Sequence, residues 1–376
     1  MEIYVVERGD SVDAIALREG VSAESIIYAN QLVYPYELAV GQALLLQKGE
    51  STADRSVSVN GYAYPFIREW TLSETLPYLT SLSVFSYGFT SEGDLLSPAL
   101  DDTWMIERAQ TADVMPILTL TPFGADGRFD NRLIHSVVNN EAYADRLIED
   151  MLSVMEEKGF GGVDIDFEYI LPEDRDAFTA FVRKVHTVMN ENGYLLSVAL
   201  APKTSADQPG LLYEGKDYRA LGEAADSVLL MTYEWGYTYG PPMGVAPVHK
   251  VRQVVEYAVT EIVPGKIDLG IPNYGYDWPL PYERGVTMAK TIGNVEAVRI
   301  AIQNGAEIRF DETAQSPFFR YTADGVEHEV WFEDVRSLQA KFDLIKEYGL
   351  RGAGYWQIMQ FFRANWLLLS DMFYIL

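Results

Sequence analysis

The sequence predicts an α/β fold: a TIM (β/α)8 barrel with a small α+β insertion between strands 7 and 8, preceded by a βααβ module. Three observations predict it. The length of 376 residues suits one barrel of ordinary size plus a small module. Hydrophobic residues make up 48% of the chain, which is enough for a large core. Beyond the first 57 residues, apolar β-rich runs alternate with helical patterns through the rest of the chain.

Eight apolar runs are the candidate barrel strands. They are Val57–Phe66, Leu82–Phe89, Val114–Thr121, Gly162–Tyr169, Leu195–Ala201, Val228–Tyr233, Ile267–Tyr274 and Gly352–Gln357. Several are almost continuous Val, Ile and Leu, as expected of parallel strands that helices cover. Helical patterns such as Asp174–Asn190 and Val335–Tyr348 lie between them. The barrel domain is therefore expected over residues 58–376.

The connection between the seventh and eighth runs is too long for a simple loop. Residues 280–333 hold a helix-like segment, Asn294–Asn304, and then three strand-like segments. Those segments are Ile308–Phe310, Phe318–Tyr321 and Val330–Phe332. We expect an α+β insertion that walls one side of the cleft.

The first 47 residues form a separate pattern. A short strand, Ile3–Val6, is followed by the turn Gly9–Ser11 and by two helices, the second beginning at Ser22. A final strand is expected at Ala43–Leu46. Residues 48–57 are polar and without periodicity, so they are interpreted as a linker.

Charge and composition exclude several classes of function. The net charge of −26 repels nucleic acid and anionic lipid, so neither is an expected partner, whereas a neutral polysaccharide is compatible. There is no cysteine, and the four histidines are scattered, so we expect no metal and no cofactor. The 24 Tyr and 7 Trp suit a sugar-binding cleft, although most of them are expected to serve packing.

No secretory signal and no membrane span are visible in the sequence. The chain begins MEIYVVERGD, without a basic and then apolar run, and no apolar stretch approaches the roughly 20 residues of a span. We expect a monomer.

The sharpest chemical signal is the alternation of three carboxylates in Gly161–Tyr169. Asp164, Asp166 and Glu168 would share one face of a strand, and in a barrel that face points inward. Glu168 is nearest the C-terminal mouth, where barrel active sites lie. Because close like charges raise pKa values, Glu168 is the expected proton donor, and the three groups are expected to titrate as a coupled set.

This motif resembles that of glycoside hydrolase family 18, DxxDxDxE. Three of its four acidic positions are present, and Gly161 stands at the first. The resemblance implies hydrolysis of β-1,4 bonds in N-acetylglucosamine-containing glycan, with retention by substrate-assisted catalysis. It also implies that Asp166 orients the 2-acetamido group and that Glu168 acts first as acid and then as base.

The resemblance extends to other cleft positions. Tyr233, within Met231–Glu234, matches the family's Met-x-Tyr-Asp and would hydrogen-bond the acetamido oxygen, while Glu234 replaces the Asp and leaves that contact open. Trp356 matches the Trp that floors the −1 sugar, with barrel packing as the alternative. Weaker substrate-binding candidates are Tyr62, Tyr274 and Tyr276, together with Trp235 in the aromatic loop Trp235–Pro242.

The N-terminal 47 residues resemble a LysM module. Tyr4-Val5-Val6, Gly9-Asp10-Ser11, Asn30-Gln31-Leu32 and Val40-Gly41-Gln42 match its spaced elements in order. The resemblance implies glycan binding, with Gly9, Asp10, Ser11 and Asn30 as candidate residues. The alternative is that Asp10 and Ser11 only cap the first helix.

The order of the two units is similar to that of spore cortex-lytic N-acetylglucosaminidases, which usually carry two LysM modules. That resemblance implies peptidoglycan or another N-acetylglucosamine polysaccharide as partner, and a place in the spore envelope or cell wall. A chitinase or endo-N-acetylglucosaminidase remains the first alternative. A lectin-like protein or a tethered coat protein is the second, but Glu168, Asp166 and Tyr233 are all present, which favours an enzyme.

Overall fold

A closed parallel barrel forms the centre of the molecule. The computed structural model describes all 376 residues. The eighth strand pairs with the first, which closes the ring. The barrel strands are β3 Ser56–Ala63, β4 Ser81–Phe89, β6 Met115–Leu120, β7 Gly162–Ile165, β8 Leu195–Leu200, β9 Ser227–Leu230, β10 Ile267–Pro272 and β16 Gly352–Trp356. The predicted TIM barrel is therefore confirmed.

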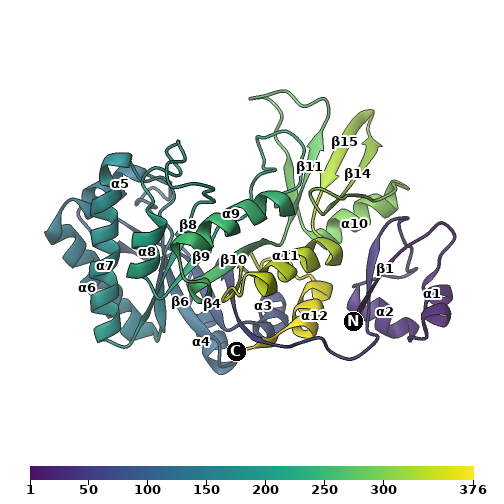
Figure 1. Ribbon diagram of the computed structural model, residues 1–376, viewed down its shortest axis with the longest axis horizontal. Helices are drawn as coiled ribbons and strands as arrows, with labels where there is room; N and C mark the ends of the chain where they lie inside the picture. The colour runs from purple at the N-terminus through teal and green to yellow at the C-terminus, as the bar shows by residue number, and fades with distance from the viewer.

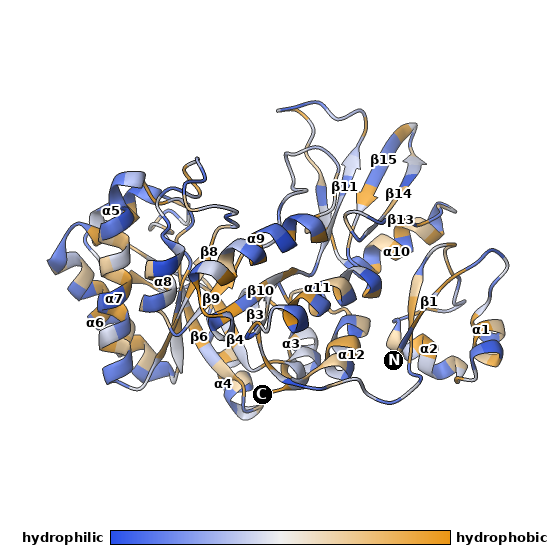
Figure 2. Cartoon of the chain, viewed as in Figure 1, coloured by the Kyte–Doolittle hydropathy of each residue, from blue (hydrophilic) through white to orange (hydrophobic).

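Amphipathic helices surround the strands and bury their apolar faces on them (Figure 2). They are α3 Glu69–Thr75, α4 Thr103–Thr111, α5 Asn131–Val138, α6 Glu141–Lys158, α7 Arg175–Glu191, α8 Tyr218–Ala224, α9 Val248–Glu261, α11 Val335–Glu347 and α12 Arg363–Met372. In α7, for example, Phe178, Val182, Val185 and Met189 follow one another at helical spacing and are all buried. Two short strands, β5 Leu95–Leu96 and β17 Tyr374–Ile375, lie at the edges of the sheet. No helix combines the length and the apolar character needed to cross a bilayer.

The fourth barrel strand is shorter than the sequence predicts. β7 ends at Ile165, whereas the apolar run continues to Tyr169. The ladder reaches one residue further, because the Asp166 amide donates to the Leu120 carbonyl over 2.9 Å. Glu168 lies beyond this last ladder bond, so its direction is set by the loop after β7 rather than by strand alternation.

The insertion is larger than the sequence predicts. Its antiparallel sheet has the order β12-β11-β15-β14-β13 and packs with helix α10 (Figure 1). The elements are β11 Gly275–Pro279, β12 Lys290–Ile292, α10 Asn294–Gln303, β13 Arg309–Asp311, β14 Ser316–Ala323 and β15 Val326–Trp331. The expected helix and three strands are present. β11 and β12 were not predicted, because one is a short aromatic stretch bounded by glycine and proline and the other has only three residues.

The N-terminal module is the predicted βααβ unit. β1 Glu2–Val5 pairs antiparallel with β2 Ala43–Leu46, and α1 Val12–Glu19 and α2 Ala23–Ala29 lie between them. Ser11 caps α1 by accepting a hydrogen bond from the Ala14 amide. A small apolar cluster inside the module holds the two helices against the two strands.

The module is docked against the rest of the chain on one side (Figure 1). The Ile308 amide donates to the Val40 carbonyl over 2.9 Å, and Ala39 joins the apolar core of the insertion. The Gln31 side chain accepts a 2.6 Å hydrogen bond from the Arg363 amide, at the start of α12. The module is thus joined by backbone and side-chain contacts to both the insertion and the last helix.

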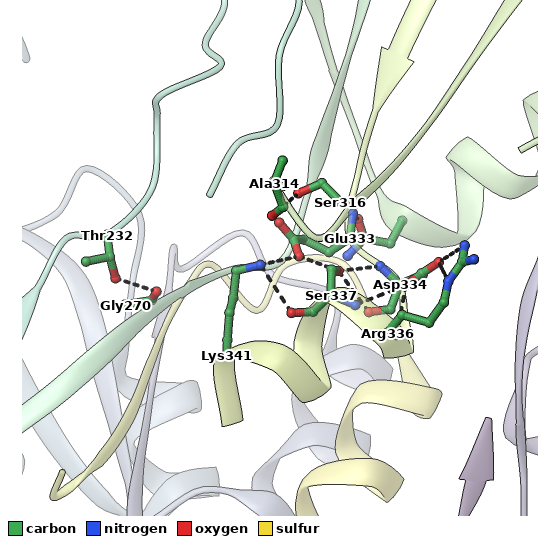
Figure 3. Close-up of polar contacts among 10 residues, drawn as sticks. Thr232, Gly270, Ala314, Ser316, Glu333, Asp334, Arg336, Ser337 and Lys341 are labelled. Atoms are coloured by element: carbon green, nitrogen blue, oxygen red, sulfur yellow. Dashed lines mark hydrogen bonds and ion pairs between the residues drawn. The ribbon is translucent and has the colours of Figure 1, made fainter. Parts of the chain in front are cut away.

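A buried ion pair lies beside this junction (Figure 3). Glu333 and Lys341 are both wholly buried, and their charged atoms are 2.8 Å apart. The Ser337 hydroxyl donates to the same Glu333 oxygen over 2.5 Å. From the same stretch of chain, Arg336 donates to the Gly41 carbonyl over 3.2 Å, so the network reaches the N-terminal module.

Candidate active site

A cavity of about 650 Å³ opens where the barrel strands end, a volume typical of ligand pockets. Six residues that the sequence singled out as catalytic or substrate-binding line it: Tyr62, Asp166, Glu168, Tyr233, Glu234 and Trp356. Tyr237, from the aromatic loop, also lines it. The barrel therefore brings together, at one mouth, residues from its first, fourth, sixth and eighth strands.

Asp164 is held below the cavity by two hydroxyl groups. Its carboxylate accepts a 2.8 Å hydrogen bond from Tyr62 and a 2.6 Å bond from Ser197. Burial raises the pKa of Asp164, and the two hydroxyl bonds act against that rise. Because both of its oxygens have partners and it does not line the cavity, Asp164 is placed to support its neighbours.

Asp166 and Glu168 form a coupled pair at the cavity wall. Asp166 is 7% exposed, and its Oδ1 has no hydrogen-bond partner. Burial, followed by the charges of Glu168 and Asp164, raises the pKa of Asp166 well above its usual range. Burial also raises the pKa of Glu168, against the positive charge of Lys216. A buried acceptor without a partner is costly. Asp268 and Glu333 also have one such oxygen each, but of these three carboxylates only Asp166 lines the cavity.

The tyrosines near the carboxylates differ in what their hydroxyls contact. Tyr274 and Tyr276 both donate to Glu234 Oε1, the latter over 2.8 Å. Tyr233 makes no such bond within the chain, and burial followed by the Asp166 charge raises its pKa well above the usual range. Its hydroxyl is therefore free to donate to a ligand. Tyr274 lies behind Glu234 and does not line the cavity.

Trp356 both packs inside the barrel and faces the cleft, the two roles that the sequence left open. Its ring packs against Phe85, with centroids 4.8 Å apart, and against Tyr62 at 5.8 Å. It also lines the cavity and is only partly buried. The side chain is held from behind by aromatic contacts while it presents surface to the cleft.

Comparisons with known proteins identify the family of the chain. The sequence model of glycosyl hydrolases family 18 matches residues 123–360, and that of the LysM domain matches residues 4–47. The chain belongs to glycoside hydrolase family 18. This family 18 glycoside hydrolase carries one matched LysM domain, on the same residues that fold as the N-terminal βααβ module.

Relatives of this family 18 hydrolase share its whole length. The cortical fragment-lytic enzyme of Bacillus subtilis (strain 168) is 42% identical over 428 residues, covering 99% of this chain and 98% of the relative. The putative sporulation-specific glycosylase YdhD of the same organism is 34% identical over 97% of this chain and 86% of its own. The crystal structure of the spore cortex-lytic enzyme SleL of Bacillus megaterium QM B1551 superposes with a TM-score of 0.93. It is 35% identical and covers 100% of this chain and 98% of its own.

Trp235 lies elsewhere than predicted. It does not line the cavity of the hydrolase but is partly buried and packs against the main barrel core. Its amide donates to the Val245 carbonyl over 3.1 Å, which folds the loop back on itself. Because of this fold, Tyr237 faces the cleft in its place.

Three positions at or near the cavity carried no signal in the sequence. Leu212 and Tyr213 line the cavity from the loop between β8 and α8, and Lys216 follows them with a wholly buried side chain. The loop is an irregular stretch rich in Ser, Gly and Pro, without a motif. Only the folding of this loop over the ends of the strands brings these residues to the site.

The predicted glycan-binding residues of the first loop of the LysM module make contacts within the module. Gly9 is exposed and has a φ of 91°, a left-handed conformation that favours glycine. Asp10 accepts a 2.6 Å hydrogen bond from Tyr4 and pairs with Arg18, while Ser11 caps α1. The predicted capping by Ser11 is thus observed, and the loop is held in one conformation.

Asn30 is used entirely within the LysM module. Its amide nitrogen donates to the carbonyls of Ile26 and Leu45, over 2.9 and 3.0 Å. Its amide oxygen accepts from the Leu45 amide over 2.7 Å. The side chain therefore joins α2 to β2. If Asn30 affects glycan binding, it does so by shaping the loop that follows it and not by direct contact.

Proposed function

We propose that this family 18 hydrolase cleaves β-1,4 bonds of N-acetylglucosamine-containing glycan, in peptidoglycan or spore cortex fragments, with retention by substrate-assisted catalysis. The observation that carries the proposal is the unpartnered, buried Oδ1 of Asp166 beside Glu168 in one cavity. An acetamido N–H is a donor of the kind that this oxygen lacks. The cavity thus holds an acceptor for the substrate's own nucleophilic group and a carboxylic acid for the leaving group.

The steps follow from these positions. Asp166 accepts the acetamido N–H, and the Tyr233 hydroxyl donates to the acetamido oxygen, so that this oxygen is aimed at the anomeric carbon. The glycosidic oxygen takes the proton of Glu168 as its bond to the anomeric carbon breaks and the oxazolinium ring forms. The negative charge of Asp166 stabilises that cation. Glu168 then removes a proton from water, which attacks the same carbon and restores the acetamido group.

The remaining cleft residues would hold the sugar. The face of Trp356 suits stacking against the ring of the sugar at the reacting position, since an aromatic face packs well on an apolar sugar face. Tyr62 fixes Asp164 beneath it. Glu234 is held by hydrogen bonds from two tyrosines and faces the cavity, where it would accept a hydrogen bond from a sugar hydroxyl.

The proposed substrate rests on the relatives and on the LysM module. The names of two relatives, the cortical fragment-lytic enzyme and the spore cortex-lytic enzyme SleL, concern spore cortex and its fragments. We therefore propose peptidoglycan as partner, a spore-envelope location and a monomer. Residues 1–47 would bind glycan, with Gly9, Asp10 and Ser11 shaping one loop and Asn30 supporting the other. Residues 48–57 would link this module to the catalytic domain at 58–376.

Reducing-end release from cortex fragments and from chitin oligomers, measured in parallel, tests this function. Wild type should release ends from cortex fragments, and Glu168→Gln should lose about 10²–10⁴-fold of that rate because it cannot donate or accept the proton. Glu173→Gln, an exposed neighbour, is the matched control and should match wild type. Turnover of chitin alone would show that the enzyme is a hydrolase of chitin and not of cortex. Turnover of neither substrate would contradict the proposed hydrolase activity.

The stereochemistry is tested separately. Proton NMR of the first products should show the β-anomer before mutarotation, because two inversions at one carbon retain its configuration. An α-anomer appearing first would rule out the oxazolinium route while leaving hydrolysis intact.

A further inference from the structure

Lys216 is a wholly buried cation that the mechanism above does not use. It lies directly before the Asp217 cap of α8. Its Nζ donates one hydrogen bond, to the Ala199 carbonyl over 3.2 Å, and it has no direct ion pair. An ammonium carries three donors and a full charge. A buried charge without a contacting partner persists only where other charges nearby compensate it.

The register of the barrel places this cation beside the carboxylates. In the β7–β8 ladder Ile165 is opposite Val198, so the next residues, Asp166 and Ala199, are neighbours across the strands. Adjacent strands are about 4.8 Å apart. Asp166, Ala199 and Glu168 all line the same cavity. The carbonyl that holds the Lys216 ammonium thus belongs to the wall from which the carboxylates project.

The charges that act on Lys216 are those of the catalytic pair. Burial lowers the pKa of Lys216 to about 8, and Asp166 and Glu168 act against that fall. In return, Lys216 is the one positive charge that lowers the pKa of both carboxylates. Asp164 is the third carboxylate of the group, acting on Asp166, and the Tyr233 hydroxyl is held neutral by burial.

Lys203 is the second buried lysine of this loop, and its contacts differ. Its Nζ donates to the carbonyls of Ala206 and Lys216, each over 3.0 Å. It therefore braces the backbone of the loop and is not among the charges that act on Asp166 or Glu168.

We propose that Lys216 is the counter-charge of the catalytic carboxylates and sets how many protons they hold. With the cation in place, the group can keep a proton for the glycosidic oxygen and, at the same pH, a negative charge for the oxazolinium ion. Without it, burial would drive the carboxylates to take up a further proton, and the anion would be lost. Lys216 is thus a positioning residue that acts through Asp166 and Glu168. The inference rests on the proposed function for its meaning in catalysis.

The pH dependence of kcat/KM on cortex fragments tests this role. In Lys216→Met the acidic limb of the profile should move up by about 1–3 pH units, the range over which one nearby charge shifts a pKa. Lys216→Arg, which keeps the charge, should restore the wild-type limb. Lys203→Met is the matched control: it should lower the melting temperature but leave the profile in place. An unchanged profile in a folded Lys216→Met would overturn the proposal.

A measurement on the wild type keeps the proposal testable should Lys216→Met fail to fold. Carbon-13 NMR of labelled Asp and Glu carboxyls should show the coupled pair titrating in two steps at least ~2 pH units apart, since one ionisation is supported by the cation and the next is not. Two carboxyls that titrate together above pH 7 would overturn it. This readout needs no turnover, so an inactive wild type would refute the proposed function without deciding the role of Lys216.

Discussion

Two buried ionic clusters in this protein are built in opposite ways. At the junction beside the LysM module, Glu333 and Lys341 are in contact at 2.8 Å, and Ser337 adds a further bond to the same carboxylate. At the mouth of the barrel, Asp166 has an oxygen without a partner, and the Lys216 cation makes no direct ion pair. Each cluster leaves one buried carboxylate oxygen without a partner, Oε1 of Glu333 and Oδ1 of Asp166, but only in the first are the opposite charges in contact. We call the first the closed cluster and the second the open cluster.

Whether the opposite charges are in contact decides whether a cluster mainly stabilises the fold or is available for chemistry. In a buried pair in direct contact, removing one partner leaves an uncompensated charge. Burial raises the carboxylate pKa in both clusters, but the carboxylates of the open cluster line the cavity, where a ligand can reach their unpartnered acceptor. Asp268 is intermediate: one oxygen pairs with Arg351 at 2.5 Å and the other has no partner, as in Glu333, but the Arg351 side chain is partly exposed to solvent.

The largest expected effect comes from breaking the open cluster. Asp166→Asn should lower turnover of cortex fragments by about 10²–10³-fold, because the anion that stabilises the oxazolinium ion is lost. Its free energy of unfolding at pH 7 should not fall, since the change removes a buried group that lacks a partner. Initial rates check the predicted loss of turnover, and urea denaturation checks the predicted free energy of unfolding. A variant that is both inactive and markedly less stable would contradict the contrast.

Breaking the closed cluster should have the reverse result. Lys341→Met should lower the free energy of unfolding by ~3–5 kcal/mol, because Glu333 is left buried without its partner. The double variant Glu333→Leu/Lys341→Met should recover most of that loss. The exposed Lys290→Met is the matched control and should stay within ~0.5 kcal/mol of wild type. A double variant as unstable as the single one would show that the pair itself stabilises the fold.

The smallest effect is the pH dependence at the intermediate site. Burial raises the pKa of Asp268 to about 6, against the pull of Arg351. The folded pKa lies above the unfolded one, near 4, so this group favours the fold below pH 4 and loses that contribution as pH rises to 6. The stability of wild type relative to Asp268→Asn should fall by ~1–3 kcal/mol between pH 4 and 7. A flat difference would contradict this, and the exposed Asp13→Asn should track wild type throughout.

Several features could be predicted because they depend on local pattern. The eight strands follow from apolar runs of Val, Ile and Leu, although β3, β7 and β9 end three or four residues before the predicted runs do. Helical spacing predicts α10 and α11 with boundaries within one residue. The spacing of Asp164, Asp166 and Glu168 identified the carboxylates before any fold was known. In each case the information lies within a few consecutive residues, as it does for periodicity and for motifs.

Other features were decided only by the tertiary structure. Lys216 lies near the cavity because the loop before α8 folds over the ends of the strands, and no local pattern indicates that a lysine there is buried. Asn30 is used inside the LysM module because Leu45 of β2, 15 residues further along the chain, supplies two of its polar contacts and α2 supplies the third. Trp235 turns to the core because its loop pairs with Val245. Sequence fixes which groups are available and their local geometry, whereas burial and charge compensation depend on contacts between segments far apart in the chain, so they are settled only when the chain is packed.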